Sequence, residues 1–536
     1  MIIGTNPYKS SKSPFIKAVP SNFFISFPIL YTILCYLIYL GLFHSPYLSN
    51  ANSNANANAN ANSNANSNVI ASINIKSPSS LFHASKEEMT KEKSRMERRI
   101  NNFPLSIRNE NEHEEIKHPG KTDVSMSVPK FWVPPISLPH AGERLMTRDE
   151  ALSIGSTVLK DDGVEYETVF VMIASYRDYQ CPETVRSIFE RAKHPERVRV
   201  GIVDQMDEAS GELPCGAPPV GGCRGGEDEQ NVLCKYRNQI DTYEMEDELA
   251  VGPCFARHVG NRMYRGEYYA MQVDAHVTFV QDWDEDVIGQ IKATKNEMAV
   301  LTTYLSDVQG SLDANGYSTR KTRPIMCNTQ YEGNQQGTFL RHNSQPEAPS
   351  MVKGSPQLEP YWAAGFSFSR GHFVVNVPYD QYLPMIFLGE EMSIGLRGFT
   401  YGYDMYANEK SICFHSYAIG ENAKKRNKVK HFWEHSNMYK GVGKKAMNRV
   451  LGVVKMNPEV PESAWDHTDL DKYGVGKVRD LQKFYKTFGI DVVKKRAATN
   501  LCQFVQYQMH GLFSEHLRDD GMGVNYDNIS FELKEK

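Results

Sequence analysis

The feature that most constrains the fold is a short apolar strand pattern, residues 268–276, that runs into an acid and a histidine. Asp274 and His276 are separated by one residue, and in an extended chain such residues point to the same face. A carboxylate oxygen beside an imidazole nitrogen suits Mn²⁺ or a related divalent ion such as Mg²⁺. The pattern therefore predicts a metal-binding pair at the mouth of a sheet. An ordinary strand that ends in polar residues is the competing interpretation.

Strand and helix patterns alternate from about residue 165 onwards, which indicates an α/β sheet. Strands are predicted at residues 169–174, 198–203, 268–274 and 298–305, and helices at residues 182–192, 253–263 and 283–294. In open sheets of this kind, ligands bind beyond the carboxyl ends of the strands. Ser175, Tyr176 and Asp204 follow such ends. We therefore expect them to line one crevice with Asp274 and His276.

Each of these side chains also has a purely structural interpretation. Tyr176 can cap a strand, or its ring can stack on a nucleobase. Asp204 can be a turn residue, or it can accept hydrogen bonds from a ligand. Arg257 lies on the helix before the metal strand, where a guanidinium can pair with an anionic ligand. A solvated basic face is the alternative there, and it explains Arg262 better.

The N-terminal part has a different character. Residues 23–43 are almost wholly apolar and uncharged, and about 20 such residues suffice to cross a bilayer as a helix. Three lysines precede this run, and no charged residue follows it until Lys76. The positive-inside rule then predicts a type II signal anchor, with residues 1–22 cytosolic and the remainder lumenal. A cleaved signal peptide is the alternative, although its apolar core is usually about 7–15 residues long.

The anchor is followed by a segment with little capacity to form a core. Residues 50–68 repeat Asn, Ala and Ser, and a charged, proline-dotted stretch continues to about residue 143. We predict a disordered stem over residues 44–160, because such composition buries too little apolar surface to fold. The predicted catalytic domain covers residues 161–440. A mainly helical extension, residues 441–536, follows it, with Val478, Leu481, Tyr485 and Phe488 at helical spacing.

Charge and cysteine content limit the kinds of partner and metal site that we expect for this chain. The formal net charge is −4 and no domain is basic, which argues against a nucleic-acid partner. Four cysteines cluster in and around a Gly/Pro-rich insert where disulfides would fasten a loop, and their pairing is left open: Cys215, Cys223, Cys234 and Cys254. The lack of a C-x-x-C pair argues against a structural zinc site. Asn528-Ile529-Ser530 is a glycosylation sequon.

Four motifs in this order resemble the GlcNAc-transferase family of protists and algae. They are Ile173-Ala174-Ser175-Tyr176-Arg177-Asp178, Asp274-x-His276, Tyr361-Trp362-Ala363-Ala364-Gly365-Phe366-Ser367-Phe368 and Leu388-Gly389-Glu390-Glu391. The resemblance covers about residues 165–481. It implies a GT-A-type fold, a UDP-sugar donor and transfer of α-linked N-acetylglucosamine, with retention, to a protein hydroxyl. Known members modify hydroxyproline of a ubiquitin-ligase subunit or threonine of mucin-like proteins.

A more distant similarity, to the mucin-type polypeptide GalNAc-transferases, implies the roles of the metal residues. In that comparison Asp274 and His276 bind Mn²⁺, and His415 completes the coordination. A buried core histidine is the alternative for His415. The Trp and Asn that accompany the second acidic motif of the GalNAc enzymes are missing beside Glu390, so one sugar contact stays open.

The acidic pair and several residues of the motifs are candidate donor contacts. Gly389 allows a helix to begin at Glu390, and adjacent glutamates then point about 100° apart. We expect Glu390 to recognise a sugar hydroxyl and Glu391 to stabilise an oxocarbenium-like transition state. Solvated first-turn acids are the alternative. The expected nucleotide-sugar contacts are Ser175, Tyr176, Arg177, Asp204, Arg257, Trp362 and Gly365, although Trp362 is equally compatible with core packing.

The sequence therefore predicts a membrane-anchored, metal-dependent transferase of the Golgi with a UDP-sugar donor and a protein acceptor. The alternatives are an inactive lumenal sugar-binding protein of the same fold, and a transferase with another donor sugar or a glycan or lipid acceptor. A lumenal site favours mucin-like threonine, because the hydroxyproline-modifying relatives act in the cytosol. Residues 333–355 and 379–384 are rich in polar residues and breakers, which suits either a mobile lid or an unstructured insertion.

Overall fold

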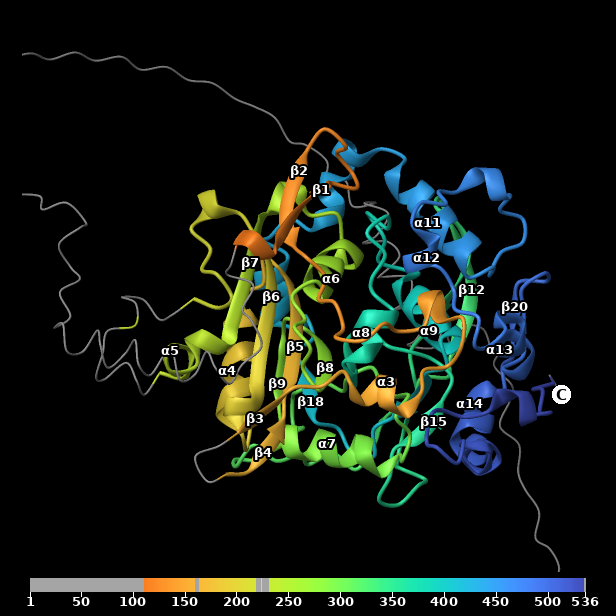
Figure 1. Ribbon diagram of the computed structural model, residues 1–536. Coiled ribbons are helices and arrows are strands. Elements are labelled where there is room, and N and C mark those ends of the chain that lie inside the picture. The colour runs from red at the N-terminus through yellow and green to blue at the C-terminus, as the bar shows by residue number, and fades with distance from the viewer. Residues whose placement is uncertain (1–109, 160–162, 218–222, 224–230, 535–536) are drawn as a thin grey trace, which may run out of the picture. The chain divides into compact units, whose positions relative to one another are not determined.

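The computed structural model describes residues 110–159, 163–217, 223 and 231–534 (Figure 1). These residues all belong to one compact unit. Within these ranges no helix combines the length and the apolar character that a bilayer crossing requires. The predicted anchor, residues 23–43, and the Asn-rich repeat lie outside the described residues.

A mixed eight-stranded sheet forms the centre of the unit, in the order β15-β17-β10-β16-β8-β5-β6-β7. Its strands are β5 (Val169–Tyr176), β6 (Val198–Met206), β7 (Ile240–Glu246), β8 (Tyr269–Asp274), β10 (Ala299–Thr302), β15 (Gln357–Glu359), β16 (Phe366–Arg370) and β17 (Asp404–Ala407). Neighbours among β5, β6, β7 and β8 are parallel, whereas β16 lies antiparallel between β8 and β10. The predicted α/β sheet is confirmed.

Strand β5 shows why the centre of the sheet reads as a continuous apolar run. Alternate side chains point to opposite faces, and both faces are covered. The residues that pack in the core beside α4 (Cys181–Arg191) are Val169, Val171 and Ile173. Those that pack against α6 (Pro253–Asn261) are Phe170 and Met172. The predicted helix at residues 283–294 is α7 (Trp283–Ala293).

Two further helices follow the third motif of the chain. They are α8 (His372–Asn376) and α9 (Glu390–Thr400). Helix α9 begins directly after Gly389, whose φ of +106° favours glycine because a Cβ would strain the backbone. The predicted helix start at the Gly-Glu-Glu motif is therefore confirmed.

The described part of the predicted stem is folded. It contains β1 (His113–Lys117), β2 (Ser125–Pro129), α3 (Arg148–Leu152) and β3 (Thr157–Leu159), and β3 pairs with β4 (Glu165–Glu167). Met126, Val128 and Ile154 are buried in the same cluster as the apolar residues of α6. The prediction of disorder up to residue 160 is therefore wrong for residues 110–159. A few apolar side chains suffice here because α6 already presents a surface that they cover.

Short two-stranded ribbons lie outside the central sheet. They pair β11 (Arg323–Pro324) with β14 (Glu347–Ala348), β12 (Thr329–Asn334) with β13 (Gly337–His342), and β9 (Val277–Phe279) with β18 (Cys413–His415). The β12–β13 hairpin occupies part of residues 333–355, which is therefore not an unstructured insertion. In the other segment with lid-like composition, Tyr379 and Asp380 are buried, and Asp380 is paired with Arg449. That burial argues against a mobile lid at residues 379–384.

The C-terminal elements lie on the side of the unit that carries β12 and β15, in blue in Figure 1. They include α11 (Val442–Val453), α12 (Leu470–Tyr473), α13 (Leu481–Thr487), β19 (Ile490–Asp491), β20 (Arg496–Ala497), α14 (Leu501–Phe504), the π-helix Val505–Met509 and α15 (His510–Phe513). Phe484 of α13 packs edge-on against Phe399 of α9. The mainly helical extension was predicted, but Val478 precedes α13 and is not part of a helix.

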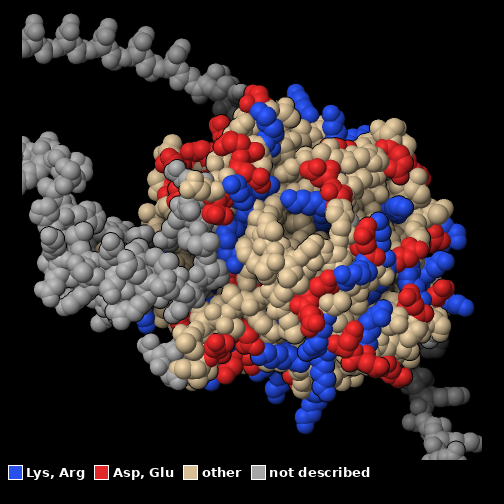
Figure 2. All heavy atoms as spheres, viewed as in Figure 1, with Lys and Arg blue, Asp and Glu red and all other residues tan. Residues whose placement is uncertain are grey.

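Three disulfides join cysteines of the described residues: Cys181–Cys215, Cys223–Cys234 and Cys327–Cys502. Cys254, which the sequence grouped with the disulfide candidates, is a buried free thiol within α6. It packs in the apolar core because its helix turns that face towards the sheet. On the face in Figure 2, Lys and Arg side chains lie interspersed with Asp and Glu.

Candidate active site

The carboxyl ends of β5, β6 and β8 meet at one edge of the sheet. The parallel register places Ser175 opposite Asp204, and Ala174 opposite Asp274. His276 follows β8 by two residues. His415 ends β18, whose partner strand β9 begins at Val277. The ribbon therefore brings His415 to the strand end that carries Asp274 and His276.

Three candidate metal ligands converge at this edge. One ligand atom each of Asp274, His276 and His415 lies within 4.8 Å of the others. The Nε2 atoms of the two histidines are 2.9 Å apart, and His415 Nε2 is 3.6 Å from Asp274 Oδ2. Burial lowers the pKa of His415, which favours the neutral imidazole that binds metals. Two imidazole nitrogens and a carboxylate oxygen are suitable ligands for a divalent cation such as Mn²⁺, and they leave further coordination positions of the cation open.

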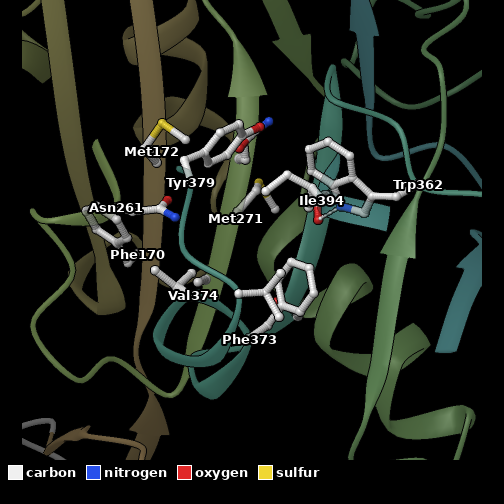
Figure 3. Close-up of a pocket in the computed structure, with 14 residues that line it drawn as sticks. Phe170, Met172, Asn261, Met271, Trp362, Phe373, Val374, Tyr379 and Ile394 are labelled. Carbon is white, nitrogen blue, oxygen red and sulfur yellow. Dashed lines mark hydrogen bonds between the residues drawn. The ribbon is translucent and has the colours of Figure 1, made fainter. Parts of the chain in front are cut away.

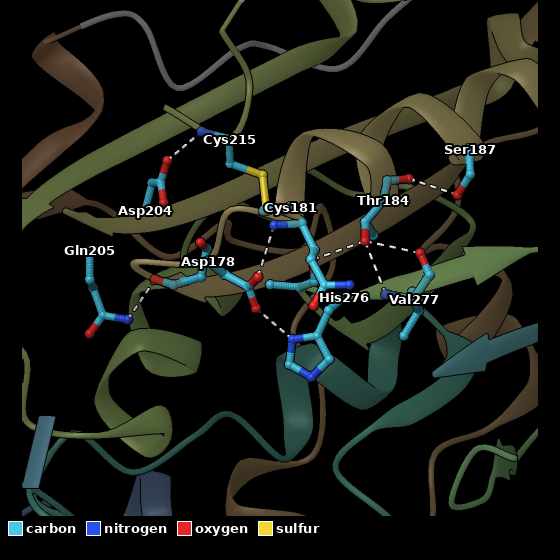
Figure 4. Close-up of a disulfide and its surroundings, with 12 residues drawn as sticks. Asp178, Cys181, Thr184, Ser187, Asp204, Gln205, Cys215, His276 and Val277 are labelled. Carbon is cyan, nitrogen blue, oxygen red and sulfur yellow. Dashed lines mark hydrogen bonds and ion pairs between the residues drawn. A yellow bond between two sulfur atoms is a disulfide. The ribbon is translucent and has the colours of Figure 1, made fainter. Parts of the chain in front are cut away.

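The second ring nitrogen of His276 is held by a carboxylate. Nδ1 of His276 lies 2.5 Å from Asp178 Oδ2, at the start of the segment that leads into α4 (Figure 4). Arg426 of α10 (Glu421–Arg426) pairs with the same carboxylate. Burial opposes ionisation of Asp178, but its hydrogen bond with His276 lowers the pKa overall. A carboxylate in this place fixes the ring orientation and leaves Nε2 facing the two other candidate ligands.

Asp274 belongs to a chain of charged groups. Arg257 Nη2 donates to Asp274 Oδ1 at 2.7 Å, and Arg257 Nη1 donates to Glu390 Oε1 at 2.5 Å. The Tyr379 hydroxyl also donates to Glu390, at 2.6 Å. Burial opposes ionisation of Asp274, but the His415 hydrogen bond and the Arg257 charge lower its pKa well below the usual range. A Cβ at Gly365 would lie 3.0 Å from Asp274 Oδ2, so glycine leaves this carboxylate its space.

Glu391 has a different environment from its neighbour Glu390. Its carboxylate accepts from the Ala364 backbone N–H at 3.0 Å and from the Tyr304 hydroxyl at 2.8 Å. Burial raises the pKa of Glu391 to about 7, against these two hydrogen bonds. The predicted divergence of the two glutamates is therefore present. Glu390 lies in an ion pair, whereas Glu391 is bound only by neutral donors.

These residues line one cavity of about 570 Å³, a size typical of small-molecule sites. The predicted residues that line it are Tyr176, Arg257, Asp274, His276, Gly365, Glu390, Glu391 and His415. Side chains without a role in the sequence prediction line it as well: Asp178, Gln205, Tyr304, Arg341, His342, Tyr417, Arg426, Phe432 and Trp433. Of these, only Asp178 had a signal in the sequence, as the last residue of the first motif.

Four predicted contacts do not line this cavity: Ser175, Arg177, Asp204 and Trp362. Strand alternation explains the correction, because Ala174 and Tyr176 face the cavity while Ser175 points to the other side. Asp204 is opposite Ser175 in the register, is buried, and accepts from the Cys215 backbone N–H at 2.6 Å. Gln205, opposite Tyr176, lines the cavity in its place.

Arg177 is engaged elsewhere. Its guanidinium pairs with Glu212 at 2.7 Å, Asp247 at 2.9 Å and Asp207 at 3.3 Å. Its φ of +48° turns the chain out of β5. Arg177 therefore fastens the loops after β6 and β7 to the end of β5, which is a structural role.

Trp362 lies in the core rather than at the donor cavity. It is 1% exposed, and its Nε1 donates to Ser367 Oγ at 2.9 Å (Figure 3). Its ring lies beside Ile394 of α9 and lines a small interior cavity with Tyr379 and Phe373. The expectation of a sugar contact is therefore corrected. Trp362 packs against α9 at Gly395, where a Cβ would lie only 3.1 Å from Trp362 Cβ.

Comparison with known proteins identifies the class. Residues 168–222 and 222–494 match the family described as Glycosyltransferase (GlcNAc), which spans more than half of the chain. The chain belongs to this family, and the predicted enzyme class is thereby confirmed. No curated protein matches the sequence.

Solved structures with distant likeness include complexes with UDP or UDP-GlcNAc. A crystal structure of GalNAc-T7 with UDP, GalNAc and Mn²⁺ is 14% identical, covers 68% of this chain and 70% of its own, and has a TM-score of 0.39. S. aureus TarS 1-349 in complex with UDP-GlcNAc is 13% identical, covers 53% of this chain and 70% of its own, and has a TM-score of 0.29.

Proposed function

We propose that this glycosyltransferase transfers N-acetylglucosamine from UDP-GlcNAc to a protein hydroxyl, of hydroxyproline, threonine or serine, and uses a divalent cation, Mn²⁺ or Mg²⁺. One observation carries the proposal. The convergent group Asp274, His276 and His415 shares a cavity of about 570 Å³ with the glutamates of α9. In metal-dependent transfer from a nucleotide sugar, a cation stabilises the charge of the diphosphate, and a carboxylate near the anomeric carbon stabilises the oxocarbenium-like transition state.

The three convergent residues would hold the cation, with Asp178 orienting His276. When bound, the cation neutralises the negative charge that develops on the departing diphosphate. Arg257 adds a fixed positive charge at the same place, and its two carboxylate partners keep it aimed at the cavity. The ring of Tyr176, edge-on to Phe432 at 6.4 Å, offers the apolar wall that a flat base requires.

Glu391 is the proposed carboxylate beside the reacting carbon. Its ionised form stabilises the positive charge of an oxocarbenium-like transition state. Glu390 is bound by Arg257 and Tyr379, which suits a fixed contact to a sugar hydroxyl. We further propose retention of the α configuration, with the departing phosphate as acceptor of the proton. No protein base is assigned.

The setting is proposed to be the Golgi lumen, with residues 23–43 as a type II anchor. Three disulfides in the described residues support an oxidising compartment, since disulfides rarely persist in the cytosol. Protease treatment of sealed microsomes tests the topology. A C-terminal tag should resist digestion until detergent is added, and digestion of the tag in intact vesicles would contradict a lumenal site.

The function is tested by nucleotide release from the purified full-length protein. Incubation with UDP-GlcNAc, Mn²⁺ and threonine or hydroxyproline peptides should release UDP and give an α-linked product by NMR. A panel of UDP- and GDP-sugars separates this donor from others, and Asp274→Asn is the matched inactive control. A folded wild-type protein that binds UDP-GlcNAc but releases no UDP with any acceptor would instead be a sugar-binding protein.

A further inference from the structure

Outside the reacting centre, the mouth of the donor cavity carries an unusual concentration of positive charge. Residues 421–435 contain five Lys or Arg residues and two Glu residues, within a chain whose formal net charge is −4. Of the five, Arg426 turns inward to Asp178, and Lys424 pairs with Glu421. Lys425, Lys428 and Lys430 are exposed.

These three lysines, here called the rim lysines, have no acidic partner among the residues that the structure describes. Lys425 lies over the ring of Tyr179 at 5.2 Å, and no carboxylate of a described residue is within 4.0 Å of Lys425, Lys428 or Lys430. In contrast, each arginine that lines the cavity itself pairs with a carboxylate: Arg257, Arg341 and Arg426. An excess of positive charge therefore faces solvent at one side of the mouth.

Aromatic side chains flank the same segment. Phe387, Trp433 and Tyr417 line the cavity and are 61%, 49% and 41% exposed. Trp433 stacks on His431 at 4.3 Å, which holds its ring at the mouth. Aromatic residues are enriched at protein-binding interfaces. Aromatic rings also suit a polypeptide, because they bury a large area with little loss of side-chain freedom.

We infer that the rim lysines and these aromatic side chains bind the acceptor, and that the acceptor is an acidic polypeptide with Asp or Glu beside the hydroxyl. The inference rests on the proposed transferase function. Charge complementarity is the argument. An acidic segment would gain three ion pairs at the mouth, while a basic segment would be repelled. The donor diphosphate does not account for these lysines, because their exposed side chains are absent from the lining of the donor cavity.

Direct binding tests the inference without requiring turnover. Three fluorescent peptides carry the same central threonine and differ only in flanks of Glu, Gln or Lys. Anisotropy with the full-length protein, UDP and Mn²⁺ should show affinity about tenfold higher for the acidic peptide than for the Gln peptide. Salt at about 500 mM should remove this preference, since ion pairs at an exposed surface are screened.

Two triple variants assign the effect to the rim lysines. Lys425→Gln, Lys428→Gln and Lys430→Gln together should remove the preference, whereas Lys321→Gln, Lys353→Gln and Lys486→Gln change the net charge equally and should retain it. Charge reversal to Glu at the three rim positions should transfer the preference to the Lys peptide. All of these positions are exposed, so circular dichroism should be unchanged.

The results separate two kinds of failure. A wild-type protein that releases UDP but binds the three peptides equally would overturn the acidic acceptor and leave the transferase intact. Preferential binding of phosphatidylserine vesicles over the acidic peptide, lost in the rim variant, would overturn it as well. Acidic-peptide selectivity without UDP release would support the binding surface while the proposed transfer reaction fails.

Discussion

The two ends of the cavity shift the pKa of a buried carboxylate in opposite directions. At the strand end, Asp274 lies beside Arg257 and two histidines, which together lower its pKa. At the helix end, Glu391 accepts only neutral hydrogen bonds, and burial raises its pKa to about 7. The difference shows that neighbouring charge, and not burial alone, decides the ionisation of each group. Asp274 at the strand end is therefore suited to bind a cation in its ionised form, whereas the charge of Glu391 at the helix end changes with pH.

The largest expected effect on activity comes from removal of the carboxylate charge at the strand end. Asp274→Asn keeps the shape of the side chain but removes the anionic ligand and the partner of Arg257. We expect metal-dependent UDP release to fall below detection, with the fold intact by circular dichroism. Cys413→Ser, a buried change on β18 outside the candidate ligand set, is the control. Activity at the wild-type level in Asp274→Asn would remove this residue from the ligand set.

Glu391→Gln tests the helix end. Loss of one electrostatic stabiliser of a transition state typically costs about 10²–10³ in kcat. We expect kcat to fall by this order while the affinity for UDP, measured by calorimetry, is unchanged. Equal losses of turnover and UDP affinity would point to a binding role instead. Glu390→Gln is the matched neighbour, and we expect it to raise the KM for the sugar nucleotide more strongly.

His415→Ala tests whether this histidine is a metal ligand at the strand end. Loss of one of three protein ligands should raise the Mn²⁺ concentration for half-maximal activity by at least about tenfold. Asp178→Asn leaves the three ligands in place and should cause a smaller shift of the same kind. An unchanged Mn²⁺ titration in His415→Ala would return this histidine to a structural role in the β9–β18 ribbon.

The smallest expected effect concerns the pH response of the helix end. If ionised Glu391 is required, turnover should rise with pH through about 7. The Tyr304 hydroxyl stabilises the ionised form, so Tyr304→Phe should raise the pKa of Glu391 and move this rise to higher pH. The measurement is kcat/KM between about pH 5.5 and 9. The Glu391→Gln variant should show no such rise. If the Tyr304→Phe profile coincides with that of the wild type, the rise does not report the ionisation of Glu391.

The sequence was sufficient for the elements that depend on local pattern. The apolar runs of β5, β6 and β8, and the glycine before Glu390, fixed the strands and the start of α9 because periodicity and backbone freedom act over a few residues. The sequence also paired Asp274 with His276, but Asp274 ends β8 and His276 lies in the turn before β9, so this turn and not strand alternation brings the two side chains together. His415, in contrast, was assigned only through a family resemblance.

Tertiary structure decided which side chains share the cavity. Ser175 and Tyr176 are neighbours in the sequence, yet the phase of β5 turns only Tyr176 towards the site. Asp178, Tyr304 and Arg426 come from three separate segments, and only the packing of those segments brings them beside His276 or Glu391. The folded stem shows the same limit, since residues 110–159 become stable by covering α6. Local sequence sets backbone periodicity, whereas burial and charge pairing are properties of contacts between distant segments.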